Sequence, residues 1–413
     1  MLGGTLWRDG EFLKLWGGQA ISEVGSQVSL LALPTVAILV LGASPFQVGL
    51  LAACENLAFP VLGLVAGVYV DRLRRRPIMI ACDVGRLLAL ASVPAAFALN
   101  VLSMEQLYAV ALITGVGTVF FDVAYQSYLP ALISRADLIE GNTKLQVTSS
   151  VAQMAGPALG GFLIQLLGPA RAVAADAASF LISVASLAWI RRPEPSPAPA
   201  GESGRRGFFA EMWEGIQVVF GNPTIWKIAG STSTSNLGSN IFFAVYLIFV
   251  YRVLHLSPGT VGVIFGAGAV GGLLGALTAA WIPRRIGLGP TLFVTILLGG
   301  LSLILVPLAQ YGWAIPLLFA SMFFGSFVNP IYNINQVSLR QAITPDRVQG
   351  RMNATVRTVI WGTIPIGALI GGIIGSTYGI VPALYTGIAV SLFAGLWILL
   401  GPIRLRVQPD AVS

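Results

Sequence analysis

The sequence predicts an all-α polytopic membrane protein with twelve transmembrane helices in two pseudo-symmetric six-helix bundles. Of the 413 residues, 55% are hydrophobic and only 10% are charged, whereas a soluble domain carries about a quarter charged residues. Apolar runs of membrane-spanning length, about 20 residues, recur along the chain, and its two halves resemble each other. Barrel strands are excluded because the runs are longer than about 11 residues and do not alternate.

The apolar runs fall into two sets of six. The first set covers residues 12–41, 46–70, 78–99, 107–133, 147–167 and 172–190, and the second covers 225–250, 260–282, 291–308, 315–339, 356–378 and 381–400. The first run lacks a cleavage site and is too long for a signal peptide, so we interpret it as a retained helix.

The longest connection divides the chain into three parts: an N-terminal bundle (1–190), a cytoplasmic linker (191–222) and a C-terminal bundle (223–413). The linker opens with Arg191-Arg192 and a run of alternating prolines, which cannot continue a helix. Apolar residues at helical spacing follow between Phe208 and Phe220. They predict an amphipathic helix on the membrane surface. The alternative is a solvated linker helix packed on the protein.

The distribution of positive charge indicates the membrane topology of the chain rather than a nucleic-acid partner. The net charge is +7, and the basic residues gather in every second connection, while the intervening connections hold only Arg171 and Arg252. The positive-inside rule therefore places both termini in the cytoplasm. We expect a multi-pass protein of the inner (plasma) membrane that binds no nucleic acid.

Three pairs of segments indicate an internal repeat of about 210 residues, of the kind that builds transporters from two similar halves. The substrate path of such a protein lies between its halves, near the bilayer midplane. The pairs are Asp137-Leu-Ile-Glu-Gly141 with Asp346-Arg-Val-Gln-Gly350, Gly156-Pro-Ala-Leu-Gly160-Gly161 with Gly367-Ala-Leu-Ile-Gly371-Gly372, and Asp122 and Tyr125 with Asn329 and Tyr332.

Residues 67–76, Gly-Val-Tyr-Val-Asp-Arg-Leu-Arg-Arg-Arg, lie between the second and third apolar runs. The segment resembles the cytoplasmic signature of the major facilitator superfamily, except that Arg74 replaces a usual glycine. The positions that match are Gly67, Asp71, Arg72, Arg75 and Arg76. The resemblance implies a gating role, in which the aspartate and the basic residues latch the two halves in the outward-open state. The alternative is a positive-inside anchor.

The fifth apolar run resembles the antiporter signature of the same family. Gly156, Pro157, Gly160 and Gly161 match it, and Ala152 stands at its first glycine. The resemblance implies an exporter that exchanges substrate for protons, and the alternative is a seam of small residues for helix packing. The arginine that such antiporters commonly carry in helix four is missing between Tyr108 and Pro130. Trp16-Gly-Gly-Gln19 with Ser22 resembles the macrolide-efflux and enterobactin-exporter branch.

Carboxyl groups within the spans are the candidates for proton coupling. They are Glu23, Asp122 and Glu55. A charge at the centre of a bilayer costs about 2.5–3.5 kcal/mol on insertion scales, so such residues usually face a cavity. Burial favours the neutral form of a carboxyl group, which can then carry a proton. We rank Glu23 first, because its helix has a continuous polar face. The alternative for each is a structural hydrogen bond.

Uncharged polar residues in the spans are the candidates for a substrate cavity, because their amides and hydroxyls suit neutral hydrogen bonding. They are Gln19, Ser26, Asn236, Asn240, Asn329, Asn333 and Gln336. Asp83 and Arg86, three residues apart, are expected to form a structural pair that supports the 67–76 loop.

Several chemistries are excluded. The chain has no Gly-x-x-x-x-Gly-Lys-Ser/Thr loop for ATP hydrolysis, and its single histidine and two cysteines provide no metal site or disulfide framework. We expect no catalytic residue, metal or cofactor, no enzyme activity, and a monomer whose partners are the lipid bilayer, protons and a small-molecule substrate.

These observations predict a secondary exporter of amphipathic small molecules (a drug, an antibiotic or a siderophore) that works by proton antiport with rocking-bundle alternating access. The alternative is a permease of the same fold that takes up lysophospholipids or other small molecules. A sensory or assembly protein built on an inactive transporter fold is the third hypothesis.

Overall fold

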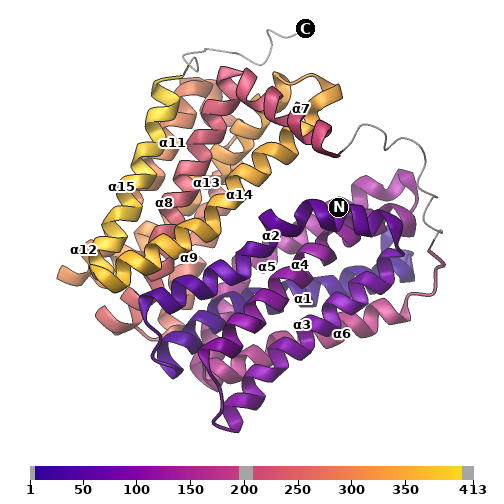
Figure 1. Cartoon of the computed structure of the whole chain (residues 1–413), viewed down its shortest axis with the longest axis horizontal. Coiled ribbons are helices and arrows are strands. Elements are labelled where there is room, and N and C mark those ends of the chain that lie inside the picture. Colours follow the sequence, from indigo (N-terminus) through magenta and orange to yellow (C-terminus); the bar gives the residue numbers. More distant parts are fainter. Residues whose placement is uncertain (1–4, 195–207, 402–413) are drawn as a thin grey trace. The chain divides into compact units, whose positions relative to one another are not determined.

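The chain folds as long helices, as the sequence predicts (Figure 1). The structure is a computed structural model that describes residues 5–194 and 208–401. Within those ranges it contains no strand, and twelve of its helical segments are long and apolar enough to cross a membrane. The prediction of an all-α polytopic membrane protein is confirmed.

Two compact units make up the chain. The first holds residues 1–43, 50–201 and 257–263, and the second holds 44–49, 202–256 and 264–413. The start of the second spanning helix therefore packs within the second unit, and the start of the eighth packs within the first. The division into bundles at residues 191–222 stays a prediction.

The N-terminal half contains six spanning segments, and the local backbone explains where some of them begin and end. Asp9 caps α1 by accepting hydrogen bonds from the backbone of Glu11 and Phe12, at 3.0 and 3.3 Å. Gly168, at φ 82°, separates α5 from α6 in a conformation that favours glycine. The helices are α1 (Gly10–Thr35), continued by a π-helical turn, η2 (Val36–Val40), then α2 (Pro45–Arg72), α3 (Arg75–Ala98), α4 (Met104–Leu132), α5 (Leu138–Leu167) and α6 (Pro169–Trp189).

The C-terminal half repeats this order and adds short helices. It opens with the amphipathic helix α7 (Phe208–Gly221). The rest are α8 (Pro223–Ile248), the π-helical turn η5 (Phe249–Val253), α9 (Pro258–Thr278), α10 (Trp281–Ile286), α11 (Leu288–Ser302), α12 (Leu305–Leu308), α13 (Ala314–Ala342), α14 (Asp346–Thr377) and α15 (Ile380–Leu399).

Local backbone details confirm the internal repeat. α1 and α8, the first spanning helices of the two halves, both end in a π-helical turn. Gly379, at φ 104°, separates α14 from α15 just as Gly168 separates α5 from α6. The pairs of helices in contact also correspond: α1 packs on α5 and α6, as α8 does on α14 and α15, and α3 packs on α4 and α6, as α11 does on α13 and α15.

Three boundaries differ from the hydropathy prediction. α5 begins at Leu138 and α14 at Asp346, about ten residues before the apolar runs that predicted them. Their first turns are polar, so they extend the helix without extending the apolar run. The predicted run 291–308 is interrupted after Ser302, where α11 ends and α12 begins three residues later.

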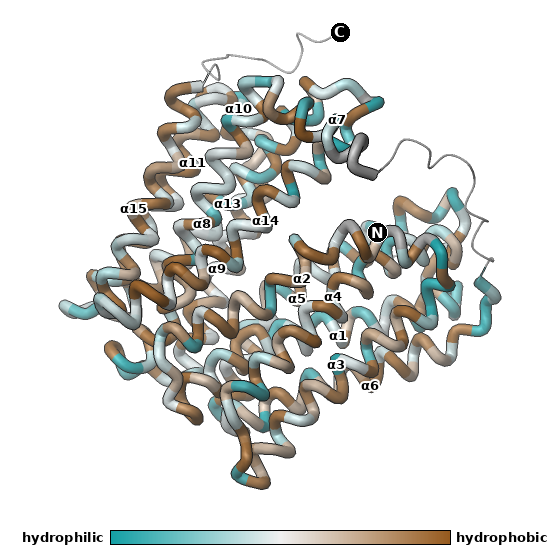
Figure 2. The backbone as a smooth tube through the Cα atoms, viewed as in Figure 1, coloured by the Kyte–Doolittle hydropathy of each residue, from teal (hydrophilic) through white to brown (hydrophobic). Residues whose placement is uncertain are grey.

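Hydrophobic residues line the long helices, and hydrophilic ones gather mainly at helix ends and connections (Figure 2). Large apolar side chains are exposed on several helices, among them Leu88, Leu277 and Phe393, at 65%, 72% and 61%. In a membrane protein such side chains face lipid, which is as apolar as the interior.

The predicted antiporter motif forms close helix contacts. A Cβ on Gly160 would lie 3.2 Å from the Cα of Val28 on α1, and one on Gly161 would lie 2.6 Å from the Cα of Gly262, within the first unit. The corresponding segment of the C-terminal half, residues 367–372, packs in the same way within the second unit. There a Cβ on Gly372 would lie 3.2 Å from the Cα of Gly49. Small residues at these positions let backbones approach closely, so the packing interpretation of the motif is confirmed. Its role in antiport stays a prediction.

Candidate transport site

Glu23 lies at a polar contact between α1 and α5. Its carboxylate accepts hydrogen bonds from Ser149 on α5 (2.9 Å) and from Gln19 one turn away on α1 (3.4 Å). Gln153 donates in turn to the Ser149 hydroxyl at 3.1 Å. Glu23, Gln19 and Ser26 are half-buried. The polar face predicted on α1 is therefore in contact with the helix that carries the antiporter motif.

Asp122 and Glu55 occupy different surroundings. Asp122 is half-buried on α4, and Tyr125, one turn further, lies near both Asp122 and Glu23. Glu55 is half-buried on α2 and lies near Asp176 on α6. The structure thus places two of the three candidate carboxyl groups within electrostatic range of one tyrosine, and the third within electrostatic range of a carboxyl group that sequence reasoning missed.

The most deeply buried charges of the first unit are Asp83 and Arg86 on α3 and Asp176 on α6, which are 0%, 6% and 1% exposed. Asp83 and Arg86 form an ion pair, which confirms the predicted pair. The Arg86 guanidinium stands between two aromatic rings, 4.6 Å from the centre of Phe121 and 4.3 Å from that of Phe180.

The ion pair is also anchored by hydroxyl groups. Ser183 on α6 donates to Asp83 at 2.6 Å, and Arg86 donates to Thr118 on α4 at 3.4 Å. Sequence reasoning did not select Asp176, although it is the one aspartate within the alanine-rich run 172–190. A carboxyl group in such a run is costly in a membrane, and this signal could have identified it.

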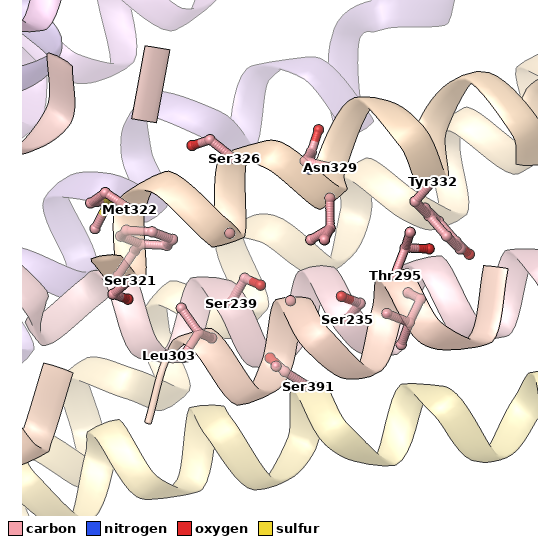
Figure 3. Close-up of a pocket in the computed structure, with 16 residues that line it drawn as sticks. Ser235, Ser239, Thr295, Leu303, Ser321, Met322, Ser326, Asn329, Tyr332 and Ser391 are labelled. Atoms are coloured by element: carbon pink, nitrogen blue, oxygen red, sulfur yellow. The ribbon is translucent and has the colours of Figure 1, made fainter. Parts of the chain in front are cut away.

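A cavity of about 240 Å³ lies in the second unit between α8, α11, α13 and α15 (Figure 3). Hydroxyl groups and apolar groups both line its wall, and none of its sixteen lining residues is charged. Drug-sized ligands occupy pockets of about 300–1,000 Å³, so the cavity suits a small molecule or one part of a larger one. Its polar lining residues are Ser235, Ser239, Thr295, Ser321, Ser326, Asn329, Tyr332 and Ser391.

The predicted amide residues fall on two helices. On α13, Asn329 lines the cavity, and Asn333 and Gln336 continue from it in a chain of amides, with donor–acceptor distances of 3.5 and 3.1 Å. On α8, the cavity is lined by Ser235 and Ser239 rather than by Asn236 and Asn240. One residue along a helix turns a side chain by about 100°, since 3.6 residues make a turn. Hydropathy and composition do not determine that rotation.

The basic residues of segment 67–76 hold the start of α3. The backbone N–H groups of Arg75 and Arg76 donate to the carboxylate of Glu194, at 2.7 and 3.2 Å. The Arg76 side chain donates to the backbone oxygen of Leu187 at 2.8 Å. An acidic group at a helix N-terminus is stabilised by the helix dipole. Sequence reasoning missed Glu194. The side chain of Asp71 lies outside what the structure describes, so its gating role stays a prediction.

Helix α7 packs on α14 through one face. Glu214 forms ion pairs with Arg347, at 3.1 Å, and with Arg351, and Val219 is buried against Met352. The interpretation of α7 as a helix packed on the protein is confirmed for this face. Trp213 and Phe220 are 59% and 57% exposed, and contact of these rings with a membrane surface stays a prediction.

A helical membrane protein with two repeats of six spans and polar residues buried in each has the architecture of a secondary transporter. The chain belongs to the Major Facilitator Superfamily, whose family model matches residues 15–334 and 228–412. The resemblance indicated by segments 67–76 and 156–161 is thereby confirmed. Members of this family are transporters of small molecules and not enzymes.

Curated relatives match nearly the whole chain. It is 23% identical to the "Multidrug efflux pump Tap" of Mycolicibacterium fortuitum, over 91% of this chain and 92% of that protein. It is 25% identical to the "Enterobactin exporter EntS" of Citrobacter koseri, over 89% of this chain and 87% of that protein. The similarity to the efflux and enterobactin-exporter branch is confirmed.

Solved structures share the fold. A bacterial homologue of the iron transporter ferroportin, in an inward-facing state, matches with a TM-score of 0.76 and 16% identity, over 96% of this chain and 99% of that one. A bacterial homologue of the human lysosomal transporter Spinster matches with a TM-score of 0.73 and 15% identity, over 96% and 97%. At this identity the likeness establishes the fold alone.

Proposed function

We propose that the protein is a secondary exporter that moves amphipathic small molecules out of the cell in exchange for protons. The observation that carries the proposal is the polar contact of Glu23 with Ser149, at 2.9 Å, because it joins a membrane-embedded carboxylate to the helix with the antiporter motif. Gly156 of that motif packs against Gln27, one turn beyond Glu23. The relatives named as efflux pump and exporter support the direction of transport.

The substrate class follows from the cavity and from the relatives. Hydroxyl groups and apolar side chains together line the cavity of the second unit, which suits a molecule with neutral polar groups on an apolar frame. Drugs, antibiotics and siderophores fit this description, and the relatives' names point to the same range.

Proton exchange supplies the energy for accumulation. One proton that enters down a potential of 100 mV yields about 2.3 kcal/mol, which corresponds to a roughly fifty-fold substrate gradient. In the proposed cycle, Glu23 is protonated from outside, and substrate arrival displaces the proton toward the cytoplasm as the bundles rock. The protein acts as a monomer in the plasma membrane with both termini in the cytoplasm.

The direct test compares Glu23→Gln with wild type in proteoliposomes, with the cationic dye ethidium as the probe. The glutamine keeps the shape and hydrogen bonds of Glu23 but carries no exchangeable proton. Accumulation driven by a pH gradient should fall far more than dye exchange down its own gradient. Glu105→Gln, at the exposed start of α4, is the matched control and should behave as wild type.

Two outcomes contradict the role of Glu23. If Glu23→Gln accumulates dye and Asp122→Asn does not, the proton carrier lies on α4. If both variants and Glu55→Gln remain fully active, proton coupling through these three residues is wrong and their carboxyl groups are structural.

A drug-susceptibility panel in an efflux-deficient host tests the direction of transport. An exporter should raise drug tolerance, and a protonophore should remove the gain. A lysophospholipid permease of the same fold would instead leave tolerance unchanged and alter the lysolipid content of the membrane. A protein with an inactive transporter fold would change neither.

A further inference from the structure

The buried cluster of Asp83, Arg86 and Asp176 has more carboxyl groups than cations. Arg86 pairs with Asp83, whose second oxygen accepts the hydrogen bond from Ser183 at 2.6 Å. Asp176 is 1% exposed and lacks an ion-pair partner among the side chains that the structure describes. Its carboxylate oxygen accepts a hydrogen bond from Ser179 at 3.0 Å, on its own helix. An ionised Asp176 would therefore be an unpaired buried charge, which is strongly unfavourable.

The hydroxyl neighbours of Asp176 are compatible with a protonated carboxyl group. The Ser29 hydroxyl on α1 is buried near this carboxyl group. A hydroxyl can accept a hydrogen bond from a protonated carboxyl group or donate one to a carboxylate. The protonated form is therefore favoured by the burial of Asp176 without an ion-pair partner, and not by Ser29.

Charges on two neighbouring helices act on Asp176. Arg86 and Asp83 face it from α3, and Glu55 faces it from α2. α1 contributes Ser29. The ion pair on α3 is nearly neutral as a unit, so it does not replace the missing counter-charge.

Helix α1 covers this site and also carries Glu23. A Cβ on Gly25 would lie 2.6 Å from the Asp176 carboxylate oxygen, so α1 closes directly over the carboxyl group. Glu23 and Gly25 are two residues apart, about 3 Å along the helix axis. A movement of α1 that changes the surroundings of Glu23 would also change the access of water to Asp176. α1, α3 and α6 pack together in the first unit (Figure 1).

We propose that Asp176 is a second proton carrier of this transporter, protonated while α1 covers it and deprotonated when water reaches it. The Asp83–Arg86 pair positions α3 against it. The proton leaves the carboxyl O–H to water, which takes it up as the α1 cover opens, and no other bond changes. The proposal rests on the proposed proton-coupled function, but the protonation of Asp176 can be measured without transport.

Infrared spectroscopy of the purified protein at neutral pH tests the protonation. Wild type should show the C=O band of a protonated carboxyl group, Asp176→Asn should lose that band, and Asp137→Asn, at the half-buried N-cap of α5, should keep it. Selective ¹³C labelling of aspartate should shift the band in wild type, so the result does not depend on the folding of a variant. If the frequency of the band does not change on aspartate labelling, or if the band is still present in Asp176→Asn, the proposal is wrong.

Transport in proteoliposomes supplies the second readout. Asp176→Asn should reduce pH-driven ethidium accumulation at least tenfold and should flatten its dependence on internal pH, whereas Asp137→Asn should match wild type. A variant with the wild-type pH profile overturns the carrier role even if the infrared band is lost. If wild type itself shows no pH-driven accumulation, the proposed function fails, and the infrared result still decides whether Asp176 holds a proton.

Discussion

Replacing Arg86 with methionine tests whether the buried ion pair holds the first unit together. The substitution keeps an unbranched apolar side chain between the rings of Phe121 and Phe180 but removes the charge opposite Asp83. Asp83 is fully buried, so it would be left without a counter-charge and with only the hydrogen bond from Ser183. Breaking a buried pair by removal of one partner costs about 3–5 kcal/mol.

This cost corresponds to a large shift in thermal stability. A domain of 150–250 residues loses about 2–4 °C of melting temperature per kcal/mol, so Arg86→Met should melt roughly 6–20 °C below wild type. Thermal unfolding of the detergent-solubilised protein, followed by tryptophan fluorescence, measures the shift. Arg86→Lys keeps the charge but loses the planar stacking on both rings. Its melting temperature should therefore lie between those of wild type and Arg86→Met.

A double variant distinguishes the unpaired charge from a simple packing defect. Asp83→Asn combined with Arg86→Met removes both charges, and replacement of a whole buried pair is often close to neutral. The double variant should therefore recover most of the loss. If Arg86→Met melts within about 2 °C of wild type, or if the double variant is less stable than the single one, the buried pair does not stabilise this unit.

Three further predictions concern gating, topology and the linker helix. Asp71→Asn should insert and fold but lose export, and unchanged export would reduce segment 67–76 to a topology anchor. In a background without the native cysteines, Val101→Cys and Tyr311→Cys should react with an impermeant reagent on intact cells and Ala136→Cys should not. The opposite labelling pattern would show that the predicted membrane orientation is wrong. Glu214→Gln should speed hydrogen exchange in α7 because two arginine contacts are weakened, and unchanged exchange would show that apolar packing alone holds α7 on α14.

The helix content and the family could be read directly from the sequence because both depend on local properties. A span inserts according to the summed transfer free energies of its own residues, so runs such as 381–400 identify a helix without knowledge of its neighbours. Hydropathy failed at helix ends, as at Leu138 and Asp346, where residues outside the apolar runs extend α5 and α14, and inside the run 291–308, which is interrupted after Ser302. The glycines at 160 and 161 were recognised because backbone contact imposes small residues at fixed spacing.

The candidate site was predicted only in part. Of the residues that the sequence singled out, Glu23 makes a polar contact with α5, Asp83 pairs with Arg86, and Asn329 lines the cavity. The transport roles of Glu23 and Asn329 stay predictions. Asp176 was missed because its significance comes from its burial under α1 without an ion-pair partner, and that burial depends on how α6 packs against a distant helix.

By itself, then, the sequence determined the number of membrane-spanning helices, the repeat and the family, whereas the tertiary structure decided which polar side chains meet. The hydroxyls of Ser235 and Ser239 line the cavity in place of the neighbouring amides because helix packing sets the rotation of α8. Likewise, Glu194 binds the start of α3 because α6 ends beside it. The rotation of a helix about its axis and the identity of its neighbours depend on contacts between distant segments. Hydrophobicity is a property of each residue alone, so it does not predict them.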